Sequence, residues 1–150
     1  MNLLIIGLKI ALLLSWYLTV SGVMKLYCED TGVHMKFDWV SWLNISGTVG
    51  VSLVALLAVI DKTTYTFTAC LIFIAIALVW FLKARLMIAG DHKALLGSKM
   101  IDQSEICKVY ARFLTLYVET KSGMIKLYGP VTERSVTMQL YDAAVGKRRK

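Results

Sequence analysis

Three long apolar runs fill most of the first half of the chain. They cover residues 3–23, 40–60 and 66–82, and the only charged residue inside them is Lys9. Each run has about 17–21 residues, enough for a helix to cross about 30 Å of hydrocarbon. The pattern predicts three transmembrane helices within residues 1–88. A cleaved signal peptide is the alternative for the first run, but no cation precedes its apolar part, which favours a retained span.

After the third run the apolar pattern changes. Residues 86–100 mix apolar and polar side chains, and we expect a short amphipathic continuation of the third helix that ends near Gly97. Farther along, apolar positions alternate with polar ones on both sides of Lys121-Ser122-Gly123, which is typical of a β-hairpin. In this hairpin we expect Val118 to pair with Ile125, and Leu116 with Leu127.

Two further segments extend the predicted sheet. Residues 107–113 also alternate, but with the opposite parity, so a turn or bulge is expected near Phe113. Residues 135–141 alternate after the Gly129-Pro130 turn, which favours a third strand; a helix over residues 131–145 is the alternative. The fold class is therefore a three-helix transmembrane region joined to a small β-rich (α+β) domain at residues 89–150.

The distribution of cations predicts how the chain is oriented. The chain has 150 residues and a net charge of +7, and thirteen of its seventeen Lys and Arg residues follow the third run. Basic residues near span ends stay in the cytoplasm, so we expect the β-rich domain to be cytoplasmic and the N-terminus to lie outside. Lys9 would then lie near the outer surface and extend its side chain toward water.

The second span carries small and polar residues that suggest a helix-packing face, used within one chain or between copies in a homo-oligomer. These residues are Ser41, Asn44, Ser46, Thr48, Gly50 and Ser52. A water-lined path formed by several copies is the alternative. Inside the spans there is no Asp, Glu, Arg or His, so a proton-coupled or ion-coupled transporter is not expected.

Candidate chemistry outside the spans is sparse. The first loop contains Asp30, His34 and Asp38, which would share a face if the loop were helical and could then bind a divalent metal; a solvated connector is the preferred interpretation. Three isolated cysteines form no metal or disulfide pattern. No motif of a hydrolase, a nucleotide-binding loop or a zinc enzyme is present. We therefore predict a protein that is not an enzyme and has no cofactor or metal.

Two surfaces remain as candidates for binding. Tyr117, Lys126, Tyr128 and Tyr141 are predicted on the polar face of the sheet, where they suit a protein interface; nucleic acid is the less favoured partner. The C-terminal run Lys147, Arg148, Arg149 and Lys150 is expected to contact anionic lipid headgroups.

These features predict an inner-membrane protein of a bacterium, plasmid or phage. Its cytoplasmic domain would bind a larger membrane protein machine and modulate or block it, as accessory, immunity and exclusion proteins do. In outline the chain also resembles phage holins with three spans, and this resemblance, which covers the topology and the run at residues 147–150, implies an oligomeric pore. Holins usually have shorter tails. A membrane tether for nucleic acid is the second alternative.

Overall fold

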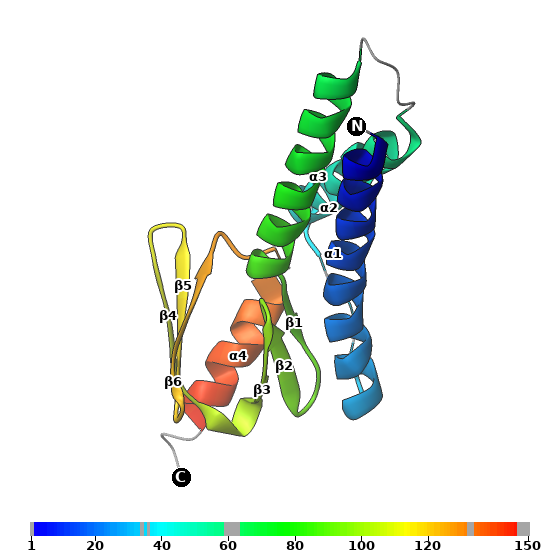
Figure 1. Ribbon diagram of the computed structural model, residues 1–150. Helices are drawn as coiled ribbons and strands as arrows, with labels where there is room; N and C mark the ends of the chain where they lie inside the picture. The colour runs from blue at the N-terminus through cyan, green and yellow to red at the C-terminus, as the bar shows by residue number, and fades with distance from the viewer. Residues whose placement is uncertain (1, 34, 36, 59–63, 132–133, 147–150) are drawn as a thin grey trace.

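The computed structural model describes residues 2–33, 35, 37–58, 64–131 and 134–146 (Figure 1). Three helices, α1 (Asn2–Glu29), α2 (Trp39–Leu57) and α3 (Tyr65–Arg85), are long and apolar enough to span a membrane. In Figure 1, α1 and α3 run in the same direction. The first loop and the domain that follows α3, which we call the polar domain, therefore lie at the same end of the bundle. The three predicted helices are confirmed, and α1 continues six residues beyond the predicted run.

After α3, the described residues form six antiparallel strands, a short 3-10 helix and one α-helix. The first sheet contains β1 (Met87–Ala89), β2 (Lys93–Leu96) and β3 (Lys99–Asp102). A short 3-10 helix, η1 (Gln103–Glu105), leads to the second sheet of β4 (Ile106–Arg112), β5 (Thr115–Thr120) and β6 (Gly123–Tyr128). Helix α4 (Arg134–Gly146) packs against β4 and β1.

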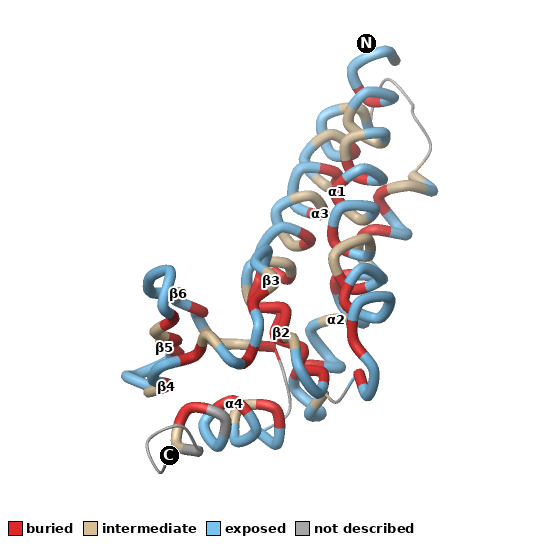
Figure 2. The backbone as a smooth tube through the Cα atoms, turned by 90° about the horizontal axis from the view of Figure 1, so that it is seen from below, coloured by how far each residue is buried: buried red, intermediate tan, exposed pale blue. Residues whose placement is uncertain are grey.

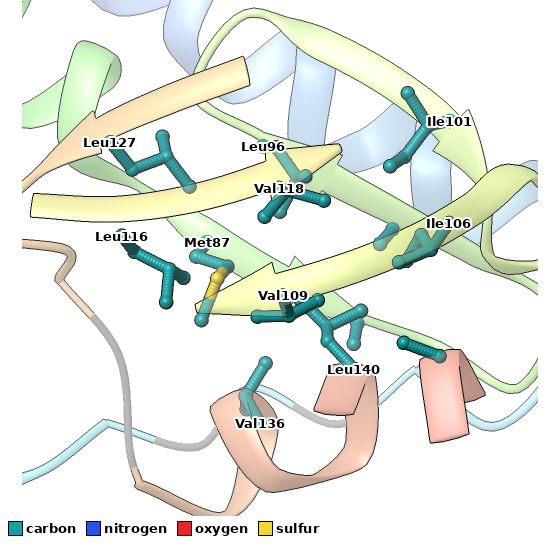
Figure 3. Packing of buried hydrophobic residues seen from close by; sticks show 13 residues of the cluster. Met87, Leu96, Ile101, Ile106, Val109, Leu116, Val118, Leu127, Val136 and Leu140 are labelled. Atoms are coloured by element: carbon teal, nitrogen blue, oxygen red, sulfur yellow. The ribbon is translucent and has the colours of Figure 1, made fainter. Parts of the chain in front are cut away.

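One apolar core holds this domain together. Figure 3 shows side chains from both sheets and from α4 pointing toward one another, among them Met87, Leu96, Val118 and Leu140. All four are less than 2% exposed. The predicted hairpin is confirmed, because Val118 pairs with Ile125 and Leu116 pairs with Leu127. The turn expected near Phe113 is confirmed at Phe113 and Leu114. A bulge between Ile106 and Lys108 was not predicted.

The helical continuation predicted for residues 86–100 is wrong, because α3 ends at Arg85 and a three-stranded sheet follows. Strand β1 is buried at every position: Met87 and Ala89 face the domain core, whereas Ile88 faces α1. A strand that is covered on both sides loses the alternation that would have identified it.

The favoured strand at residues 135–141 is also wrong, and the alternative helix is the one observed. Val136, Leu140 and Ala144 are buried at intervals of four residues, which is the spacing of one helical face. Met138, which completes the apparent alternation in the sequence, is 49% exposed. The alternation therefore does not mark a buried strand face.

Helices α1 and α2 both pack extensively against α3. Each helix is buried along one side only (Figure 2). Two indole N–H groups connect the helices: Trp16 donates to Ser52 Oγ at 3.0 Å, and Trp80 donates to Ser15 Oγ at 3.1 Å. Lys9 Nζ donates to the carbonyls of Leu56 and Ala58 at the end of α2. The cation therefore satisfies carbonyls that the helix leaves unpaired.

The C-terminal end of α1 packs against the polar domain as well as against the helical bundle. Val23 and Leu26 pack with Ile88 and Leu95 of the first sheet, and Val33 of the following loop joins the same cluster. This second apolar cluster fixes the sheet against the bundle.

Candidate functional site

The outer face of the second sheet is the most distinctive exposed surface of the domain. Three cross-strand rows build it, one residue from each of β4, β5 and β6 in every row. We call this surface the tyrosine–lysine face. Its rows are Lys108–Glu119–Met124, Tyr110–Tyr117–Lys126 and Arg112–Thr115–Tyr128. The opposite sides of the same strands carry Val109, Val118 and Leu127, so the core fixes the direction of every residue on the face.

The middle row is an ordered stack. The rings of Tyr110 and Tyr117 are 5.0 Å apart between centroids and 5° from parallel. Lys126 Nζ lies 5.9 Å from the Tyr117 centroid, and Lys108 Nζ lies 5.2 Å from the Tyr110 centroid. The 5.0 Å between the two ring centroids matches the spacing of residues directly opposite each other on neighbouring strands. The ring planes are therefore roughly perpendicular to the sheet. Both faces of Tyr117 are therefore covered.

The face carries a net positive charge. Lys108, Arg112 and Lys126 are exposed, and Glu119 is the one acidic residue in the three rows. Within the described part of the chain, none of these three cations forms a salt bridge. An unpaired cation held beside an aromatic ring remains available to a carboxylate on another molecule.

Sequence reasoning placed Tyr117, Lys126 and Tyr128 together, and the structure brings them to this face. Tyr110 was missed, although the alternation over residues 107–113 puts it on the polar side of β4, because its pairing with Tyr117 depends on the register across the Phe113 turn. Tyr141 does not lie on the sheet. It is on α4 and lines a groove of about 380 Å³ between α4 and β4, together with Met138 and the exposed Cys107.

The proposed packing residues of the second span divide into two groups. Ser41, Thr48 and Ser52 are buried against the other helices. Asn44, Ser46 and Gly50 are exposed on the surface of the bundle. The hydroxyl groups of Thr48 and Ser52 donate to carbonyls one turn earlier in their own helix.

The acidic residues of the first loop hold separate parts of the fold. Asp38 caps α2 by accepting the backbone N–H of Ser41 at 2.7 Å, and hydrogen bonds from Ser41 lower the pKa of Asp38. Asp30 is 7% exposed and accepts the backbone N–H groups of His92 and Lys93 at 2.8 and 2.6 Å. His34 lies outside the described residues. The interpretation of this loop as a solvated connector fits the exposed residues Thr31, Gly32, Met35 and Asp38, but not Asp30 and Val33, which are buried.

The sequence did not predict the structural role of Asp30, which is to bind the β1–β2 turn. Burial opposes its ionisation, but the N–H groups of Lys93 and His92 outweigh that effect, and the pKa of Asp30 lies below its usual value. Gly90 permits this approach, because a side chain there would collide with Asp30 and Val33. The carbonyl of Gly90 accepts the side-chain amides of Gln103 and Gln139. The β1–β2 turn thus joins α1, η1 and α4.

No cluster of three metal-binding side chains occurs among the residues that the structure describes. The basic run at residues 147–150 lies outside them. A scan against models of protein families, a search of curated proteins and a search of solved structures find no match for this chain. The interpretation of its function therefore rests on the geometry of the tyrosine–lysine face.

Proposed function

We propose that this chain is a small membrane protein whose cytoplasmic domain binds an acidic surface of another membrane protein through the tyrosine–lysine face. Binding would modulate or block that partner without any chemical step. The observation that carries the proposal is the stacked row Tyr110–Tyr117–Lys126 and the cations beside it. Tyrosine provides a large, rigid contact area with a polar end, and exposed cations favour association with an acidic partner.

The position of the face supports a partner in the same membrane. In Figure 1 the strands of the second sheet run in roughly the same direction as α1 and α3, with α4 on the inner side of the sheet. The tyrosine–lysine face therefore points sideways, parallel to the plane of a membrane that the helices would cross. A neighbouring membrane protein with a domain at the same height would meet it without either protein leaving the bilayer.

Nucleic acid fits this face less well. Single-stranded nucleic acid binds aromatic side chains mainly by stacking bases on their open ring faces. Here Tyr117 is enclosed between Tyr110 and Lys126, so a base would have to separate the stack first. Tyrosine hydroxyl groups can instead donate hydrogen bonds to the carboxylates of a protein partner.

A pore is also less well supported. Ser41, Thr48 and Ser52, half of the polar set in the second span, are buried inside one copy and are not available to line a channel. The exposed remainder, Asn44, Ser46 and Gly50, contains one amide side chain. Several copies would therefore bring little polar surface to a common path.

Site-specific photocrosslinking of the full-length protein in cells tests the proposal. A photoreactive amino acid replaces Tyr128, which is 63% exposed on the face, or Asp142, which is exposed on α4 and serves as the control position. We expect a nuclease-resistant adduct with a membrane protein from position 128 and none from position 142.

Charge reversal adds a matched comparison. Lys126→Glu should reduce the yield of the adduct about tenfold, because like charges across an interface repel. Lys121→Glu makes the same change in net charge at the exposed β5–β6 turn and should leave the yield unchanged. Equal adducts from both positions, a nuclease-sensitive adduct, or equal effects of the two reversals would each contradict the proposal.

A further inference from the structure

The turn between β4 and β5 exposes two large apolar side chains. Phe113 is 96% exposed and Leu114 is 84% exposed, although they lie in a domain with a well-packed core. We call these two residues the hairpin tip. Two adjacent, almost fully exposed apolar side chains at the end of a hairpin are suited to contact with another apolar phase.

The backbone of the hairpin tip is unusual for its sequence. Phe113 has a φ of 54°, and it is the one non-glycine residue with positive φ in the described part of the chain. The left-handed conformation costs free energy for a residue with a side chain, and Gly or Asn normally occupies such a position. The chain places its most exposed aromatic residue there instead. Such strain is found where the side chain has a role outside the fold.

Hydrogen bonds hold the hairpin tip beside the end of α3. The N–H of Gly129 donates to the carbonyl of Leu114, and Arg85 Nε donates to the carbonyl of Gly129. A groove of about 320 Å³ runs between the tip and Arg85, bordered by Pro130. Figure 1 shows the β4–β5 turn at the height of the last turns of α3 and directed toward the same side as the helices.

The last turns of α3 have the composition of a membrane boundary. Trp80 is 49% exposed, and Lys83 Nζ lies 5.1 Å from its ring centroid. At the same height on α1, Ser21 and Lys25 line a hollow together with Lys83. Aromatic and basic residues gather at the level of lipid headgroups. The hairpin tip, held beside Arg85, therefore lies at the surface of any bilayer that α3 crosses.

We propose that the hairpin tip inserts into the boundary between headgroups and acyl chains of the bilayer that the helices span. Phe113 and Leu114 would enter the apolar region, and the exposed Arg112 next to them would meet lipid phosphates. Insertion would fix the second sheet at right angles to the membrane and so present the tyrosine–lysine face along the membrane plane. The inference requires the membrane location of α3 and does not depend on any protein partner.

A fluorescent label tests the insertion in the purified full-length protein. The three native cysteines are replaced, and a cysteine that carries the environment-sensitive dye NBD is introduced at Leu114 or, as the control, at Lys121. Lys121 is exposed in the turn at the opposite end of the same strand. Both proteins are reconstituted without a partner in vesicles of phosphatidylcholine and phosphatidylglycerol.

We expect the label at position 114 to be quenched by lipids that carry a nitroxide on the acyl chain. Aqueous iodide should quench it about fivefold less than the label at position 121, because the apolar region excludes the ion. Phe113→Asp should restore iodide quenching at position 114 and leave position 121 unchanged.

Equal iodide quenching at both positions would overturn the proposal. Protection that disappears as the vesicles are diluted with lipid would also overturn it, since that result assigns the hairpin tip to contacts between copies. Neither result affects the photocrosslinking test of the tyrosine–lysine face, which is made on other residues.

Discussion

The carboxylate of Asp30 helps to hold the polar domain to the end of α1, and its removal should release the β1–β2 turn. In Asp30→Ala the N–H groups of His92 and Lys93 lose their acceptor. A buried N–H without a partner costs about 1–3 kcal/mol. Water can reach part of this turn, because His92 is exposed, so the lower limit applies to each donor. The expected cost is about 2 kcal/mol, or about 30-fold in the local opening equilibrium.

Hydrogen–deuterium exchange of the full-length protein in lipid nanodiscs measures this effect. Amides of the β1–β2 turn should exchange about 30-fold faster in Asp30→Ala wherever the exchange rate follows the opening equilibrium. Asp142→Ala, which removes an exposed carboxylate from α4, is the control and should exchange like the wild type. Unchanged protection in Asp30→Ala would refute the role of Asp30 in joining α1 to the domain.

The pH dependence of the same contact has a definite sign. The pKa of Asp30 is lower in the folded protein than its unfolded value of about 3.9. The stabilisation is therefore complete above that value and is lost as the pH falls through the lower folded pKa. Asp30→Asn keeps one acceptor oxygen and cannot ionise, so its opening equilibrium should change less than that of the wild type over that acidic range; the remainder comes from Glu29, which pairs with Lys93. An equal acid response in wild type and Asp30→Asn would assign the response to other groups.

Three further changes test other parts of the structure. A double-mutant cycle of Trp16→Phe and Ser52→Ala, measured by detergent unfolding, should give a coupling of about 0.6–1 kcal/mol, and zero coupling would contradict the hydrogen bond between α1 and α2. Gly97→Ala places a side chain at a φ of +62° and 3.0 Å from a carbonyl of α3, so it should lower the free energy of unfolding by about 1–2 kcal/mol. Gly47→Ala, in open surroundings, is its control and should cost much less. Phe113→Asn relieves backbone strain and should raise the stability in detergent by up to about 1 kcal/mol, whereas a loss would mean that the turn requires the aromatic ring.

The parts of this fold that sequence reasoning found are those with one buried face and one polar face. The hairpin of β5 and β6 alternates cleanly because Leu116 and Val118 face the core while Tyr117 faces solvent. The three apolar helices were evident from length and composition alone. In both cases the local sequence carries the whole signal.

The parts that sequence reasoning missed depend on contacts between distant residues. Strand β1 is covered on both sides, by α1 and by the domain core. Ile88 is therefore as apolar as its neighbours, and the sequence shows no alternation of apolar and polar residues there. In α4 the apolar residue Met138 is exposed, which produced a false alternation. Asp30 and Lys93 are 63 positions apart, and no local pattern indicates that they meet.

The residues of the tyrosine–lysine face divide in the same way between local and distant contacts. Tyr117, Lys126 and Tyr128 belong to the hairpin, whose register the turn fixes, so their shared side could be predicted. Tyr110 stacks on Tyr117 because the turn at Phe113 and Leu114 sets the register between β4 and β5, which the alternation within β4 does not specify. Tyr141 was assigned to the sheet because its segment was interpreted as a strand.

The orientation of the domain is the claim on which the proposed function depends, and labelling of Cys107 tests it most directly. Cys107 is exposed on β4 and remains as the single cysteine when Cys28 and Cys70 are replaced. A matched variant without native cysteines carries Thr64→Cys at the opposite end of the bundle. A maleimide that does not cross membranes should label position 64 in intact spheroplasts, and should label Cys107 only after the membrane is permeabilised. Labelling of Cys107 in intact spheroplasts would place the tyrosine–lysine face outside the cell and contradict the account.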